Sequence, residues 1–291
     1  MNPNTVLDEV EQGAPATRDE EGRPPGRRRG LRATLIVLAC VVVLAVVAAL
    51  VFFLGRDRAE ELTDDQALDD FRAANSGSSE AAGRPDAGVY AATATGNESI
   101  GLPGFDEELG PNAPLTLTYG DGVCFTSRVD FNSHHWRSWT YCPSSTATFA
   151  LVGLESWTPR KAPGLDLTTL STYTCDTPLD VVWAEPTVGE TRAGACTGVS
   201  DLDDAVTADR AAAEVLGLDT IEIDGRDVDV VRVRTTDEFS DAQTGTEVGE
   251  WWFDATTGLP VRFSVDASLS GGSGDYAEDF DVTLTSLRPA T

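Results

Sequence analysis

The chain is poor in the side chains that most enzymes use for acid–base chemistry and metal binding. Its 291 residues include two histidines, His134 and His135, and a single lysine, Lys161. Neighbouring residues on a strand point to opposite faces, so these adjacent histidines are not placed to share one metal ion. We expect both to be surface residues of a hairpin loop. We predict no catalytic, cofactor-binding or metal-binding residue, and no enzymatic activity.

The motifs that hold nucleotides or activate a serine are also missing. The sequence has no P-loop, no G-x-G-x-x-G run and no G-x-S-x-G elbow. The acidic run Asp201–Asp209 offers carboxylates for Ca²⁺ but lacks the central glycine and closing glutamate of an EF-hand loop. An envelope hydrolase built on a pair of carboxylates is therefore the least favoured hypothesis.

Basic residues are scarce and unevenly placed. Residues 1–32 hold six of the 21 basic and six of the 48 acidic residues, and residues 33–55 hold no charge. The rest of the chain therefore holds 15 basic and 42 acidic residues, and it carries the whole net charge of −27. Because so acidic a surface repels phosphate backbones and anionic headgroups, we expect no nucleic-acid partner.

One uncharged run is long enough to span a membrane. Residues 33–55 (ATLIVLACVVVLAVVAALVFFLG) would form a helix of roughly 35 Å, enough to span a bilayer core. We predict an uncleaved transmembrane helix, with Cys40 inside it, rather than a lipobox or a signal peptide. The arginines crowd its N-terminal flank, so the positive-inside rule places the N-terminus in the cytoplasm. The protein is then a single-pass protein of the cell membrane with its C-terminal domain outside.

Composition and residue spacing predict the nature of three further segments. Residues 1–32, rich in Pro, Gly and charge, are predicted to be a disordered cytoplasmic tail. Residues 56–87 are predicted to be a juxtamembrane helix, with a capping box at Thr63 and Gln66, and a linker. Residues 88–291 alternate apolar and polar side chains between turn residues, which is typical of antiparallel β-structure.

The cysteines and one turn fix parts of the strand register. Cys124, Cys142, Cys175 and Cys196 make an even count in the predicted outer domain, which indicates disulfides. A hairpin turning near Ser133 would set Cys124 opposite Cys142, Phe125 opposite Tyr141, Ser127 opposite Trp139 and Val129 opposite Arg137. The bond between Cys175 and Cys196 then follows by elimination. Asp224-Gly225 predicts a second hairpin, with Ile223 opposite Arg226 and Ile221 opposite Val228.

The stretch Glu250–Ser264 (EWWFDATTGLPVRFS) also predicts a hairpin. Asp254 is placed to accept hydrogen bonds from backbone N–H groups. Gly258 is placed to adopt a positive φ, and Pro260 is placed to begin the return strand. The six tryptophans of the chain are interpreted mainly as core. Trp252, Trp183 and Trp157 are the candidates for aromatics that face a ligand.

Several motifs together resemble a known group. LTDDQALDDFRAA, GVYAATATGNESI, the two cysteine segments and WWFDATTGLPVRFS are similar to uncharacterised actinobacterial single-pass membrane proteins with a disulfide-braced extracytoplasmic β domain. More loosely, W-x-D-x-x-T-G-L-P-V-R resembles a hairpin of LolA/LprG-like lipoprotein and lipid carriers, which implies a half-barrel over an apolar cavity. The carriers are soluble or lipid-anchored, whereas this chain keeps a transmembrane helix.

The fold class expected is mainly β, or α+β at most: the transmembrane helix is followed by a twisted antiparallel sheet, for which a half-barrel is one form. The first function hypothesis is a membrane-anchored binding or interaction module of the cell envelope, with an envelope protein or a lipid as partner. The alternative is a half-barrel carrier or sensor of an apolar ligand such as a lipid or a lipoprotein acyl chain. That alternative requires an apolar cavity of several hundred Å³ on the concave face.

Overall fold

The computed structural model describes residues 27–74, 83–102, 104–120, 122–145, 147–202, 204–272 and 274–291, and their side chains from Thr34 onward. The chain divides into two compact units, residues 1–54 and 55–291. The predicted tail falls outside the described residues up to position 26, as does the linker at positions 75–82.

The first unit contains one long apolar helix. Helix α1 (Arg27–Leu54) begins within the segment that the sequence assigned to the tail, so it includes the flanking arginines. Its part from Thr34 to Leu54 has a mean hydropathy of 3.4 and no residue buried inside the structure. The helix is therefore long and apolar enough to cross a membrane, as an anchor or a signal sequence would be.

A short helix precedes the sheet in the second unit. Helix α2 (Asp64–Ala74) begins at the predicted capping box: the Thr63 N–H donates to Gln66 Oε1 at 2.9 Å, and the Gln66 N–H donates to Thr63 Oγ1 at 3.3 Å. Its buried face, Ala67 and Phe71, packs with Val89. The structure thus has a short helix within residues 56–87, starting at Asp64.

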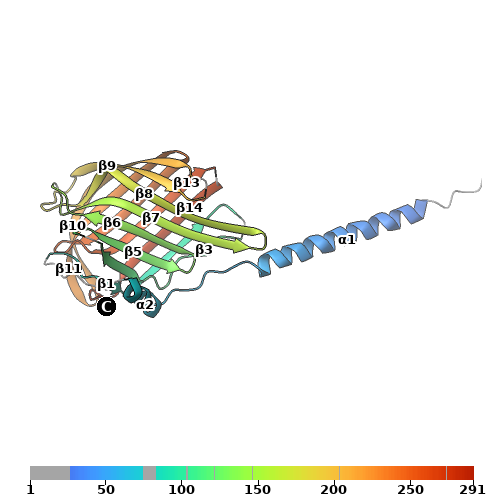
Figure 1. Ribbon diagram of the computed structural model, residues 1–291, viewed down its shortest axis with the longest axis horizontal. Helices are drawn as coiled ribbons and strands as arrows, with labels where there is room; N and C mark the ends of the chain where they lie inside the picture. The colour runs from blue at the N-terminus through green and yellow to red at the C-terminus, as the bar shows by residue number, and fades with distance from the viewer. Residues whose placement is uncertain are drawn as a thin grey trace, which may run out of the picture. The chain divides into compact units, whose positions relative to one another are not determined.

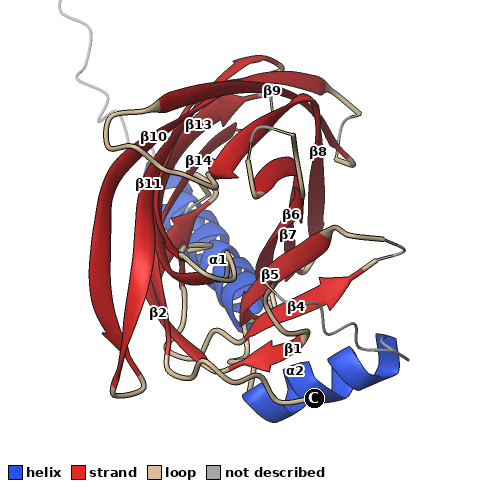
Figure 2. Ribbon diagram, turned by 90° about the vertical axis from the view of Figure 1, so that its left-hand side faces the viewer, coloured by secondary structure: helices blue, strands red, loops and turns tan. Residues whose placement is uncertain are grey.

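The rest of the second unit is one antiparallel sheet (Figures 1 and 2). Its strands are β1 (Gly88–Tyr90), β2 (Ala92–Ser99), β3 (Glu107–Glu108), β4 (Leu115–Tyr119), β5 (Phe125–Asn132), β6 (His135–Cys142), β7 (Phe149–Ala162), β8 (Leu165–Val182), β9 (Thr191–Ser200), β10 (Val206–Ile223), β11 (Arg226–Asp241), β12 (Gln243–Asp254), β13 (Pro260–Gly271) and β14 (Gly274–Leu284).

The sheet curls until its two ends meet. From β4 to β14 each strand pairs with the next one in the sequence, which is a continuous meander. The segment 88–99 then pairs with both ends, because β1 pairs with β4 and β2 pairs with β14. Figure 2 shows the strands arranged around a common interior. The mainly β, half-barrel fold predicted from the sequence is confirmed.

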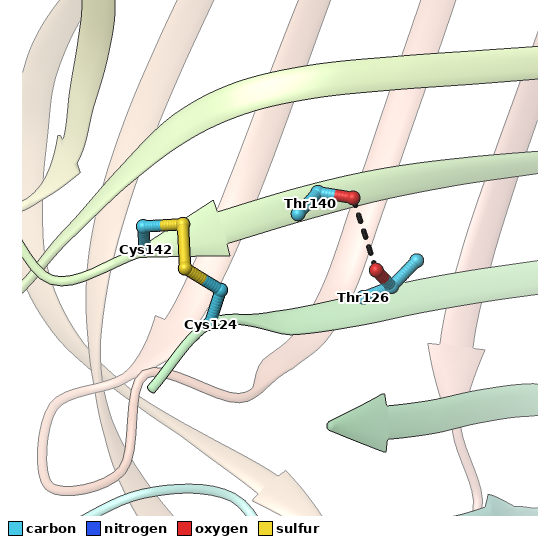
Figure 3. The surroundings of a disulfide bond; sticks show 4 residues. All are labelled: Cys124, Thr126, Thr140 and Cys142. Carbon is cyan, nitrogen blue, oxygen red and sulfur yellow. Dashed lines mark hydrogen bonds between the residues drawn. A yellow bond between two sulfur atoms is a disulfide. The ribbon is translucent and has the colours of Figure 1, made fainter. Parts of the chain in front are cut away.

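The predicted registers and disulfides are confirmed as well. Phe125 pairs with Tyr141 in the β5–β6 hairpin, and Ile223 pairs with Arg226 across the Asp224-Gly225 turn. Two disulfides join the four cysteines of the β domain in the predicted pairs, Cys124 with Cys142 and Cys175 with Cys196. Figure 3 shows the first disulfide beside a hydrogen bond between Thr126 and Thr140, which links the same two neighbouring strands.

The Glu250–Ser264 stretch is the expected hairpin between β12 and β13. Asp254 Oδ1 accepts hydrogen bonds from the backbone N–H groups of Thr256 and Thr257, with N–O distances of 2.8 and 2.7 Å. Gly258 has a φ of +77°. A Cβ at Gly258 would lie 2.7 Å from the ring of Phe149. Gly258 therefore suits this turn in two ways, through its positive φ and through its close approach to the core residue Phe149.

Most of the interior is apolar. The rings of one group pack against one another in edge-to-face, tilted and stacked arrangements, with ring centroids 4.8–6.1 Å apart. We call it the aromatic cluster: Phe125, Trp139, Tyr141, Phe149, Trp251, Phe253 and Phe263. It fills the concave face next to the β12–β13 turn.

Candidate ligand-binding pocket

Charged residues occupy the same inward rows of the sheet as the aromatic cluster. On β6, His135 and Arg137 precede Trp139 and Tyr141 at every second position, and all four are buried. On β14, Glu278 precedes Phe280 in the same way. The curl of the sheet brings these rows together, although the residues lie far apart in the sequence.

Eight charged residues, all buried or nearly buried, form a network that we call the charged cluster. It has four bases and four acids, and every base lies within 4 Å of two carboxylates. For His134 the second carboxylate is that of the exposed Asp57, which is not counted among the eight. The members are His134, His135, Arg137, Arg160, Glu98, Glu107, Glu247 and Glu278.

Arg137 connects two strands from the opposite side of the curl. Its Nη2 donates to both carboxylate oxygens of Glu247, at 2.9 and 2.8 Å, and its Nη1 donates to Glu278 Oε2 at 3.0 Å. Burial by itself would lower the pKa of Arg137, but Glu247 and Glu278 outweigh it and raise that pKa. The guanidinium therefore stays charged inside the sheet.

His135 is fully buried between two carboxylates. Its Nδ1 lies 3.1 Å from Glu98 Oε1, and its Nε2 lies 3.0 Å from Glu278 Oε1. Burial opposes the charge, yet Glu98 and Glu278 raise the pKa of His135 to about 9. Burial would also raise the pKa of Glu278, but Arg137 and His135 hold it at about 2. His135 is thus an imidazolium at neutral pH.

The second half of the charged cluster involves the segment that follows α1 in the sequence. Arg160 is paired with Glu98 and with Glu107. His134 lies 3.1 Å from both Glu107 and Asp57, and its hydrogen bond with Glu107 is the main cause of its raised pKa. The Asp57 N–H also donates to the Lys161 carbonyl at 2.8 Å. The segment 55–63 is therefore fastened to this end of the sheet.

Two more inward acids adjoin the charged cluster without a cation of their own. Asp237 on β11 is the cross-strand partner of Glu247, and Asp209 lies on β10 opposite Phe239. Burial is the main cause that raises the pKa of both, and Glu247 adds to it. The pKa of Asp209 reaches about 7. Neither oxygen of Asp209 has a hydrogen-bond partner among the described residues.

A pocket of about 150 Å³ lies over the charged cluster. Its floor includes Arg137, Arg160, Glu247 and Glu278. Most of its wall is apolar or hydroxylic, and it comes from strands β7 and β8, from the segment after β2, and from the β9–β10, β11–β12 and β13–β14 ends. The described wall residues are Ile100, Leu102, Leu154, Ser156, Thr158, Leu167, Thr169, Ser171, Tyr173, Leu202, Phe239, Gln243, Leu269, Ser270, Gly271, Gly274, Asp275 and Tyr276.

The pocket ends at the charged cluster. Beyond Glu247 and Leu154 there is a second space of about 20 Å³, bounded by Asp237 and members of the aromatic cluster. The concave face is therefore filled there by aromatic side chains. Each of these two spaces is smaller than the several hundred Å³ that the carrier hypothesis requires.

The histidine prediction was wrong. His134 is 4% exposed and His135 is 0% exposed, and each has a ring nitrogen 3.1 Å from a carboxylate oxygen. The error came from reading the β5–β6 turn as a free loop, whereas the curl of the sheet and the segment 55–63 cover it. No group of three or more His, Cys, Asp or Glu side chains is arranged to hold a metal ion in the part of the chain that the structure describes.

The three tryptophans chosen from the sequence lie away from the pocket. Trp252 is half-buried, with the Arg262 guanidinium 4.9 Å from its ring. Trp157 stacks on Trp136 at 6.2 Å, and Trp183 is buried in the apolar core. The pocket residues were missed because they are spread over many strands. One signal was present: the predicted register placed Arg137 on the aromatic face of its hairpin.

No protein-family model, no curated protein and no solved structure matches this chain.

Proposed function

We propose that the protein is a membrane-anchored binding module of the cell envelope whose pocket takes a small amphiphilic ligand. The observation that carries the proposal is an apolar wall over a charged floor in one concave site of about 150 Å³. Small-molecule sites commonly combine mostly apolar linings with a few polar groups that orient the ligand.

The anchor and the compartment are part of this proposal. Helix α1 supplies a segment of sufficient length and hydropathy, and the arginines at its N-terminal flank favour an N-terminus in the cytoplasm. Two disulfides support an oxidising compartment for the β domain. A reporter fused to the C-terminus should be active only outside the membrane, and a signal confined to the cytoplasm would contradict this topology.

The size of the pocket limits the ligand. A cavity of about 150 Å³ is large enough for a benzene-sized molecule. A small ring or the end of a chain fits, whereas a complete lipid acyl chain does not fit inside the described cavity. This favours a binding or sensing module over a carrier that encloses its lipid.

The test is to fill the pocket and compare binding. Ser171 lines the wall, and Thr172, the next residue of β8, points to the other face. We expect Ser171→Trp to abolish binding of benzene-sized probes to the purified full chain in detergent, measured by ligand-observed NMR. Thr172→Trp is the matched control and should bind normally. Equal binding by both variants would place the ligand elsewhere and contradict the proposal.

Native mass spectrometry of the full chain gives a second, unbiased readout. A copurified small molecule that Ser171→Trp loses and Thr172→Trp keeps would support the proposal. A copurified complete lipid would instead favour the carrier hypothesis.

A further inference from the structure

The pocket end of the interior holds more acids than bases. The charged cluster balances four bases against four acids, while Asp209 and Asp237 add two buried carboxyls. Among the described residues no cation forms an ion pair with either of them. At neutral pH this part of the interior therefore either carries uncompensated negative charge or keeps bound protons.

Asp209 is the sharper sign of a missing partner. Its side chain belongs to a residue that is only 2% exposed, and both of its oxygens lack hydrogen bonds in the described structure. A buried carboxylate without partners is costly, because water no longer solvates it and nothing replaces the water. Such a group suits a site completed by a ligand.

Asp209 also adjoins the pocket wall. Phe239 is its cross-strand partner on β11, and Tyr173 on β8 lies close enough for the two to influence each other's charge. Both Phe239 and Tyr173 line the pocket, and their rings pack edge-to-face at 5.8 Å. The aromatic wall thus separates the pocket from an unpaired carboxyl.

We propose that the ligand of this pocket is a small organic cation, a primary ammonium on a benzene-sized apolar body, with Asp209, across the aromatic wall, as its counter-charge. This inference rests on the proposed binding function and specifies its ligand. The ammonium lies beside the rings of Tyr173 and Phe239, and the apolar body lies against the leucines of the wall.

The charges of the site favour a cation over an anion. Arg137 and Arg160 line the floor, but each already pairs with two carboxylates of the charged cluster. An anion would compete with those carboxylates and add to the excess of negative charge. A cation in the pocket lies against the two aromatic rings of the wall, which attract positive charge, with the unpaired acid on the far side of that wall. The net charge of −27 also concentrates cations near the protein.

A metal ion is a poorer match than an organic cation. The described residues contain no group of three or more metal-ligating side chains at one point, and the wall is mainly apolar. Glu247 keeps both oxygens on Arg137. A singly charged group with an apolar body uses both the charge and the wall.

Ligand and proton should compete for Asp209. The groups that face it are Glu247 on β12, Asp237 on β11 and Tyr173 on β8, with Arg137 on β6 behind them. Burial and Glu247 raise the pKa of Asp209 to about 7, so the carboxyl is largely protonated below that pH. A bound cation stabilises the ionised form, so its affinity should rise as the pH increases through 7.

The experiment compares three probes of one shape and different charge. Benzylammonium, benzyl alcohol and benzoate are titrated into the purified full chain in detergent, by calorimetry at pH 6 and pH 8. We expect benzylammonium to bind about tenfold or more tightly than benzyl alcohol at pH 8, and benzoate to bind weakest. The benzylammonium advantage should shrink several-fold at pH 6.

Two variants locate the counter-charge. Asp209→Asn should weaken benzylammonium about tenfold and remove its pH dependence, while benzyl alcohol binding, which reports an intact pocket, stays unchanged. Asp166→Asn, an exposed residue of β8, is the matched control and should change neither.

The outcomes separate the inference from the proposed function. If benzyl alcohol or benzoate binds as tightly as benzylammonium, or if Asp209→Asn binds benzylammonium normally, the cation inference is wrong and the binding module stands. If none of the three probes binds at either pH, both are overturned.

Discussion

The aromatic cluster and the charged cluster fill one interior and lie on the same strands, but they are held together differently. On β6 the change from one to the other takes a single step of two residues, from Arg137 to Trp139. Both residues are almost fully buried, at 4% and 3% exposed. The sheet imposes equal burial on two kinds of side chain whose energetic requirements are opposite.

The aromatic cluster depends on contact area, which is non-directional, so its stability should change gradually as atoms are removed. The charged cluster depends on each charge keeping its partner. Removing one member leaves another charge buried without compensation, which costs more than the pair itself contributes. Burial alone therefore does not indicate how a region responds to mutation.

The strongest test of this difference is Arg137→Met, which keeps much of the side-chain volume and removes the charge. Glu247 and Glu278 would lose their shared partner, so we expect a loss of about 3–5 kcal/mol in the free energy of unfolding. Urea unfolding of the full chain in detergent, followed by tryptophan fluorescence, measures it. Arg234→Met, whose pair with Glu214 is half-exposed, is the control and should lose less than about 1 kcal/mol.

A second test uses pH instead of mutation. The folded-state pKa of His135, about 9, is above its unfolded value of 6.5. Its stabilising contribution is therefore complete below pH 6.5 and is lost as the pH rises through 9. Glu278 has the opposite shift, to about 2, so its contribution is present above about 4.5 and is lost as the pH falls through 2.

We expect the free energy of unfolding to fall by roughly 2–4 kcal/mol between pH 6.5 and pH 9. The slope should flatten in His135→Gln, whatever the overall stability of that variant. Asp209→Asn should keep the slope above pH 7.5, because the pKa of Asp209 is lower, at about 7. A wild-type protein whose stability is constant over this range would show that His135 is not buried as an imidazolium.

The two clusters also differ in how far the sequence predicts them. Alternation and turn residues were sufficient for the mainly β fold, for both disulfides and for the hairpin registers, because those depend on neighbours along the chain. The aromatic cluster follows from the same alternation. The charged cluster does not, because charged residues in a strand normally mark the solvent face.

Arg137 shows what the sequence contained and what it lacked. The β5–β6 register placed Arg137 opposite Val129, on the face of Phe125 and Trp139. That placement alone indicates a buried charge that needs a partner. Its partners are 110 and 141 residues away in the sequence, and only the closed curl of the sheet brings them together. The pocket depends on the same long-range closure.

A smaller effect is expected within the aromatic cluster. Phe263 stacks on Trp251 at 4.8 Å and is 1% exposed. Phe263→Leu keeps the site apolar and removes part of the ring, so we expect a loss of about 1–2 kcal/mol by urea unfolding. Trp252→Leu, on the outer face, should lose less. A loss at Phe263 as large as that of Arg137→Met would mean that the two clusters are equally intolerant.

The smallest expected effect tests how tightly the aromatic cluster is packed where the β12–β13 turn closes it. Gly258 and Gly225 both have positive φ, +77° and +68°, so alanine should cost about 1 kcal/mol of backbone strain at either turn. Only at Gly258 does the added Cβ meet a side chain, the ring of Phe149 at 2.7 Å, whereas Gly225 faces open space.

Thermal unfolding of Gly258→Ala and Gly225→Ala separates the two costs, because the backbone term is common to both. If the aromatic cluster is closely packed, Gly258→Ala should lose a few tenths of a kcal/mol or more beyond Gly225→Ala. Equal losses would show that Phe149 moves aside freely. The aromatic cluster would then be loosely packed at this turn. Its smaller sensitivity to mutation, compared with that of the charged cluster, would then come from loose packing rather than from the kind of interaction.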